Sequence, residues 1–249
     1  MGKNVFANSK MSEEELQSLF VKVKEDMGIQ NEDLDNIFQV MMLDRKTLFP
    51  EQNKQSEEEC LRKWINGYIQ SENNLPSSHI GEPKKTCSDP ALAKIVKNAC
   101  GLDNNEIVVM EKAHNLFMSA ENIQGELLEE YIAENVKNFG WLWCSGNSIR
   151  AVDFCKRDGS ALLQIKNKNN TENSSSSAIR NGTKIEKWYR LKTRKKNGIP
   201  YPSYEWDKLN DIINKGIENG EVVCKMSEEG YAKFLDRVAT ENPGIITEI

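Results

Sequence analysis

The chain has 249 residues, 38% of them hydrophobic and 29% charged, so it is long enough to bury a substantial core. Eight Phe, five Trp and six Tyr argue against a disordered chain. No apolar stretch approaches the ~18 residues of a membrane span, and the first ten residues, MGKNVFANSK, show no targeting signal, so we expect a cytoplasmic protein without a membrane partner. Six scattered cysteines without a CxxC pair, and two histidines, make a structural zinc site improbable.

The basic residues are concentrated in one segment. The net charge is −5, yet residues 165–198 contain ten Lys or Arg against two Glu, a local charge of +8. A basic block on an acidic body indicates an anionic partner for that block, and nucleic acid is such a partner.

The first hundred residues show the start signals of four helices. The N-cap residues are Ser12, Asn31, Ser56 and Asp89, and each precedes apolar residues at helical spacing. The fourth helix ends near Gly101, and residues 73–88 form a loop. Two further helices are expected over 104–119 and 120–138.

The pattern then changes to the two-residue period of strands. Residues 149–154 predict a strand, 156–159 a turn and 161–166 the returning strand. Further on, a helix is expected over 206–217, a strand over 222–226 and a helix after Ser227. We therefore predict an α/β or α+β fold with a central mixed sheet flanked by helices. Residues 1–101 form its helical N-terminal part and 102–249 its core, including the basic segment 167–198, in one compact domain.

The predicted hairpin brings three chemically useful side chains together. Gln164 and Lys166 share a strand face, and Asp153, roughly opposite Leu162, lies diagonally from Gln164. Mg²⁺ prefers such oxygen ligands, and a lysine beside it could orient or deprotonate an attacking water. On spacing alone, a solvated surface hairpin is the favoured interpretation.

The preceding helix offers a second carboxylate. Glu129 flanks the apolar face of that helix, whereas Glu130 lies further round, so Glu129 is the better placed of the two. For either residue alone, a solvated acidic helix face is at least as good an interpretation.

The run from Ile149 to Thr183, with Asp153 before Gln164-Ile-Lys166, resembles type II restriction endonucleases of the PD-(D/E)xK superfamily, in particular the SinI-like group. The resemblance covers roughly residues 120–190. It implies a restriction-endonuclease-like fold and Mg²⁺-dependent cleavage of double-stranded DNA at a short specific sequence. Asp153, Gln164, Lys166 and Glu129 would be catalytic, and all but Lys166 metal ligands. Val152 replaces the motif proline, and Gln164 stands where the motif has an acid.

The resemblance also favours a DNA-recognition role for the polar segment, which would otherwise be a flexible linker. Arg can bind guanine bidentately, and hydroxyl groups can contact phosphates or base edges. The expected DNA-binding residues are Asn173, Ser174, Ser175, Ser176, Ser177, Arg180, Thr183, Lys184, Lys187 and Arg190.

A palindromic site would be matched by a homodimer, and a DNA methyltransferase is the expected functional companion. Membership of the subgroup would imply GG(A/T)CC as the recognition sequence. Two alternatives stay open from the sequence. They are a nonspecific repair or recombination nuclease of the same fold and a non-catalytic nucleic-acid-binding module.

Overall fold

The computed structural model describes residues 4–52, 56–81, 89–168, 184–218 and 220–246. Its helices are α1 (Glu13–Asp26), α2 (Glu32–Met42), α3 (Glu57–Asn73), α4 (Pro90–Cys100), α5 (Asn104–Val136), α7 (Trp206–Ile213) and α8 (Glu228–Glu241). The strands are β1 (Trp141–Trp143), β2 (Phe154–Lys156), β3 (Leu162–Lys168), β4 (Ile185–Lys196) and β5 (Ile199–Tyr204). They form one sheet in the order β1-β2-β3-β4-β5, in which only β3 and β4 are parallel. The predicted mixed sheet flanked by helices is confirmed.

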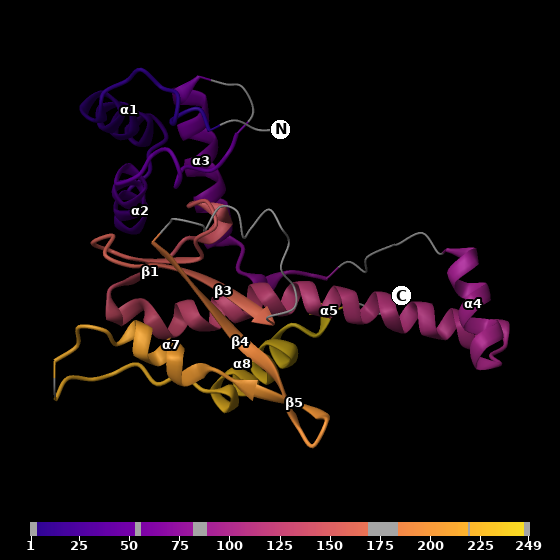
Figure 1. Ribbon diagram of the computed structural model, residues 1–249. Helices are drawn as coiled ribbons and strands as arrows, with labels where there is room; N and C mark the ends of the chain where they lie inside the picture. The colour runs from indigo at the N-terminus through magenta and orange to yellow at the C-terminus, as the bar shows by residue number, and fades with distance from the viewer. Residues whose placement is uncertain (1–3, 53–55, 82–88, 169–183, 219, 247–249) are drawn as a thin grey trace.

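The sheet separates two hydrophobic cores. On one face, Phe154, Leu163 and Ile165 pack with residues of α5, α7 and α8. On the other face, Cys155 and Leu162 pack with residues of α1, α2 and α3. Figure 1 shows these two groups of helices on opposite sides of the sheet. Successive residues of one strand thus belong to different cores, so the N-terminal helices pack directly on one face of the sheet.

The four predicted N-terminal helix starts are confirmed. Ser12 and Ser56 each form a capping box with the Glu three residues later, and Asn31 and Asp89 cap α2 and α4. The two helices expected over 104–138 are one continuous helix, α5, which includes 33 residues. In the described part of the chain no helix is long and apolar enough to cross a membrane.

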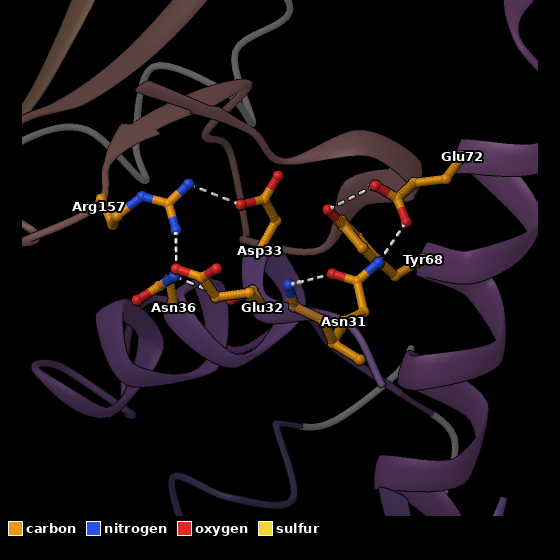
Figure 2. A network of polar contacts seen from close by, with 8 residues as sticks. Asn31, Glu32, Asp33, Asn36, Tyr68, Glu72 and Arg157 are labelled. Carbon is orange, nitrogen blue, oxygen red and sulfur yellow. Dashed lines mark hydrogen bonds and ion pairs between the residues drawn. The ribbon is translucent and has the colours of Figure 1, made fainter. Parts of the chain in front are cut away.

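Polar contacts connect the N-terminal helices to the sheet (Figure 2). Arg157, in the turn after β2, pairs with Glu32 and Asp33 at the start of α2, at 2.8 Å each. Asn31 donates to Glu72 of α3 at 2.7 Å. These groups are exposed, so they orient the layers more than they stabilise them.

The predicted strand over 149–154 is wrong. A tight turn at Arg150 and Ala151 joins Ile149 to Val152 in an isolated bridge, and Ala151 has a positive φ of 60°. Ile149 and Val152, two of the apolar residues that suggest a strand, are buried on the two sides of this turn. The strand proper begins at Phe154.

The strand expected over 222–226 is also wrong. The backbone N–H and carbonyl of Cys224 bond to the Asn214 side chain, and those of Met226 bond to the Asn210 side chain. Two asparagines of the α7 region therefore take the hydrogen bonds that a neighbouring strand would have made. Cys224 and Met226 are still buried, as the alternation implied.

The fold predicts that the N-terminal helices unfold together with the sheet. Phe38 is fully buried and stacks on Phe20 with ring centroids 3.9 Å apart, so Phe38→Ala should lower the free energy of unfolding by about 3–5 kcal/mol. Urea unfolding followed by fluorescence and circular dichroism should show one shifted transition. Val21→Ala on the exposed face of α1 is the control, with a change within about 0.5 kcal/mol. A separate early transition in Phe38→Ala would contradict this coupling.

Candidate active site

The register of the β2–β3 pair differs from the expected one and brings Asp153 closer to Gln164. Cys155 pairs with Leu162 and Phe154 with Leu163, so Asp153 lies opposite Gln164 rather than Leu162. The backbone of Asp153 is bonded on both sides. Its N–H donates to the carbonyl of Leu163 in β3, and its carbonyl accepts the N–H of Cys144, just after β1, each at 2.9 Å. Asp153 thus continues the ladder past the end of β2.

The Asp153 carboxylate is held against the backbone of β3. Its Oδ2 accepts the N–H of Ile165 at 2.6 Å. Ile165 is the residue between Gln164 and Lys166, and its own side chain lies in the core on the other face. The carboxylate is therefore directed to the face that Gln164 and Lys166 share.

Gln164 is a buried amide with an unused acceptor. Its side chain is 4% exposed, and its Oε1 accepts no hydrogen bond from the residues that the structure describes. A buried amide oxygen without a donor costs about 1–3 kcal/mol. This is the kind of cost that proteins sustain where a ligand completes the site.

The third group comes from α5. Glu129 is largely buried, and its Oε2 accepts the indole N–H of Trp143 at 3.2 Å. Burial, and next the negative charge of Asp153, raise the pKa of Glu129 from 4.5 to about 8. The Trp143 hydrogen bond and the positive charge of Lys166 oppose this shift of the pKa. Glu129, Asp153 and Lys166 are therefore close enough to interact electrostatically.

Glu130 has a different role from its neighbour. It is 3% exposed, and its carboxylate accepts the backbone N–H of Ser77 at 2.8 Å and the Ser77 hydroxyl. It thereby attaches the short 3-10 turn Pro76–Ser78 to α5. Of the two adjacent acids, only Glu129 interacts with Asp153 and Lys166.

A cleft of about 330 Å³ opens beside these carboxylates. Glu129 and Asp153 line it on the side of α5 and the sheet, and Asn74 and His79 line it on the side of the segment after α3. Trp143, Asn74 and His79 were not singled out from the sequence. The alternation Trp141-Leu142-Trp143 is a strand signal that could have located Trp143.

The residues expected to bind DNA lie in different parts of the chain. Lys187 is the neighbour of Gln164 in the parallel β3–β4 ladder, as Tyr189 is of Lys166, and the Lys187 ammonium lies 5.2 Å from the Tyr189 ring centre. Lys184 is exposed at the start of β4. The remaining group, Asn173, Ser174, Ser175, Ser176, Ser177, Arg180 and Thr183, lies outside the described residues.

Arg190 is committed to contacts inside the protein. It is 6% exposed, donates to Asn167 at 2.8 Å and forms an ion pair with Glu228 of α8. Its guanidinium also lies over the rings of Tyr204 and Tyr231. The structure therefore gives Arg190 a role in joining β4 to α8, which differs from the expected contact with a DNA phosphate.

The oxygen atoms of the site are suited to a hard divalent cation. Among the described residues, no three His, Cys, Asp or Glu side chains form a metal-binding group. The structure instead brings the carboxylates of Glu129 and Asp153 together, and it places Gln164, whose amide oxygen has no partner among the described residues, opposite Asp153 in the sheet. This donor set fits Mg²⁺, which takes one or two carboxylates and completes its shell with water and phosphate.

The raised pKa of Glu129 predicts that the metal-free protein loses stability as the pH rises. Between about pH 4.5 and 8, the folded chain holds a proton that the unfolded chain has released. The free energy of unfolding should therefore fall with rising pH, by up to about 1.4 kcal/mol per pH unit. Urea unfolding in EDTA should show this slope flattened in Glu129→Gln and kept in Asp211→Asn, which changes an exposed acid of α7. An unchanged slope in Glu129→Gln would contradict the shift.

Comparison with known proteins agrees with this site. The SinI restriction endonuclease family matches residues 54–240, a range that includes α5, β3 and β4. The type II restriction enzyme Eco47I of Escherichia coli is 36% identical over 174 residues, 68% of this chain and 71% of that enzyme. The type II restriction enzyme SinI of Salmonella infantis is 36% identical over 148 residues, 58% of this chain and 61% of that enzyme. The chain therefore belongs to the SinI restriction endonuclease family, and it is a site-specific endodeoxyribonuclease.

Proposed function

We propose that this chain is a Mg²⁺-dependent type II restriction endonuclease that hydrolyses phosphodiester bonds at a short palindromic sequence in double-stranded DNA. The observation that carries the proposal is the convergence of Glu129, Asp153 and Lys166 beside the unpartnered amide oxygen of Gln164. Carboxylates, an amide oxygen and a lysine are the groups that metal-assisted phosphodiester hydrolysis requires.

Glu129, Asp153 and Gln164 would hold the metal ion. The two carboxylates repel each other, as the raised pKa of Glu129 indicates, and a divalent cation between them would relieve this repulsion. Two carboxylates also match the charge of a single Mg²⁺. When bound, the ion would polarise a phosphate oxygen and lower the pKa of a bound water.

The protein side chains position the reaction. The Ile165 N–H restricts the orientation of the Asp153 carboxylate, so Asp153 is held in place before substrate arrives. Lys166 lies two residues beyond Gln164 on the same face, where its ammonium would orient the attacking water and stabilise the negative charge that develops on the phosphate oxygens.

The recognition of DNA is assigned to the basic segment that follows β3. The polar residues Asn173 to Thr183 are proposed to contact base edges and phosphates, and Lys184 and Lys187 to neutralise phosphates near the cut. We further propose a cytoplasmic homodimer that reads a palindrome, with GG(A/T)CC as the candidate site and a DNA methyltransferase as the protective companion.

Digestion of a plasmid of known sequence tests the function. Discrete fragments in Mg²⁺, and none in EDTA, are expected, and sequencing the fragment ends would identify the site. A smear would indicate the nonspecific nuclease, and binding without any cleavage would indicate a non-catalytic module. Either result would overturn the proposal.

Removing the Asp153 carboxylate should abolish cleavage. Asp153→Asn keeps the shape and one acceptor for the Ile165 N–H but removes the negative charge that holds the metal, so the rate should fall by at least about a hundredfold. Asp158→Asn, on the exposed turn after β2, is the matched control and should cut at the wild-type rate. A folded Asp153→Asn protein with near wild-type cleavage would exclude Asp153 as a metal ligand.

Gln164 variants test whether the amide oxygen contacts the metal. Gln164→Glu adds a charge to the donor set, so half-maximal cleavage should need less Mg²⁺. Gln164→Leu has a similar volume and no oxygen, so it should fold but not cut. Both effects can be measured from single-turnover rates over a Mg²⁺ titration. Activity in Gln164→Leu would show that Gln164 does not bind the ion.

A further inference from the structure

Strand β4 continues well beyond the body of the sheet. Among the described residues, its last pair with β3 is Leu191 with Lys168, and residues 192–196 pair only with β5. Asn197 and Gly198 close the turn with φ of 52° and 79°, the conformation of a tight type I′ hairpin. Residues 192–203, called here the ribbon, therefore form a two-stranded hairpin that projects from the sheet, as Figure 1 shows.

The cations of the ribbon are divided between its two faces. Lys192 and Arg194 continue the alternation of buried Trp188 and Arg190, and their side chains reach the buried carboxylate of Glu205, at 3.1 and 3.3 Å. Hydrogen bonds from Lys208, Lys192 and Arg194 lower the pKa of Glu205 to about 2, so this counterion stays charged. Glu205 thus offsets part of the positive charge of this face and holds its side chains against the protein.

The other face of the ribbon continues the face of the candidate active site. Gln164 and Lys166 pair with Lys187 and Tyr189, and the same alternation leads along β4 to Thr193 and Lys195. Lys195 lies on this face, whereas alternation places the tip residue Lys196 on the face of Lys192 and Arg194. Both lysines are exposed, and neither has an ion pair in the described part of the chain. Lys195 therefore carries positive charge outward on the face of the active site, and Lys196 carries it at the tip.

The outer edge of the ribbon, formed by β5, is poorly suited to pairing with another strand. Pro200 and Pro202 of β5 pair with Lys195 and Thr193. Proline has no N–H, so it occurs in a strand where the N–H would point away from the partner, and two such positions remove donors from the outer edge. Addition of a strand from another protein chain is thus disfavoured. The exposed lysines of the ribbon instead favour an anionic partner with a groove that can hold it.

We propose that the ribbon lies in the major groove of duplex DNA beside the cleavage site, with Thr193 and Lys195 toward the base edges and Lys196 at the tip beside a backbone phosphate. Glu205 holds Lys192 and Arg194 on the protein side. The major groove admits a two-stranded β-ribbon. Lys195 is six residues beyond Tyr189, about 20 Å along the strand, or about six nucleotides of one DNA strand. The position of the contact relative to the cut rests on the proposed function, whereas DNA binding by the ribbon does not.

Salt-dependent binding tests the contact directly. Lys195→Ala/Lys196→Ala would be compared with wild type and with Lys10→Ala/Lys22→Ala, which removes two exposed lysines near α1. Fluorescence anisotropy with a 30-base-pair duplex of mixed sequence in EDTA needs no cleavage. The ribbon variant should lower the slope of log K against log salt by about two units, so that its affinity loss between 50 and 200 mM salt is about tenfold smaller. The control should keep the wild-type slope.

A shortened duplex tests the position of the contact. On a duplex with three base pairs on each side of the mapped cut, the wild type and the ribbon variant should have the same slope, because the DNA ends before it reaches Lys195. A wild-type slope for the ribbon variant on the long duplex would overturn the proposal. So would a changed sedimentation coefficient with an unchanged slope, since it would assign the ribbon to contact between protein chains. Failure of the wild type to cut any DNA would overturn the proposed function and leave the long-duplex result standing.

Discussion

The hydrogen bond between the Ile165 N–H and the Asp153 carboxylate is the contact on which the active-site arrangement depends. It forms one residue before β2 begins, so a side chain takes the place of a backbone acceptor in the ladder. A charge-assisted bond of this kind is stronger than the backbone bond it replaces. It holds the carboxylate between Gln164 and Lys166 without any contribution from the metal.

The other groups of the site are arranged at a cost in stability. The Gln164 oxygen is buried without a donor, and the Glu129 carboxyl is buried beside another acid, which raises its pKa to about 8. Both features destabilise the fold, and a divalent cation at the proposed metal site would relieve both. The two cores on either side of the sheet provide the packing that sustains this local cost.

The basic segment is less uniform than its composition implies. Arg190 pairs with Glu228, and Lys192 and Arg194 pair with Glu205, so part of the positive charge stabilises the protein itself. Strand alternation decides which cations reach these acids, because Arg190, Lys192 and Arg194 lie on the face toward α7 and α8 while Lys195 lies on the other face. The basic segment is therefore divided between cations that pair with acids of the protein and cations that face outward.

Elements whose signals are local could be predicted from the amino-acid sequence. Capping residues and apolar periodicity predict α1 to α4, and the two-residue alternation of apolar side chains predicts β3. The turn at 156–159 is correct because its hydrogen bond joins the Gly159 N–H to Lys156, three residues earlier. Only the tertiary structure decided the placement of Asp153 opposite Gln164, the turn at Ala151 and the interaction of Glu129 with Asp153. It also decided which cations of β4 are paired, since Glu205 and Glu228 lie outside the basic segment. Such contacts join residues distant in sequence, and local propensity carries no information about them.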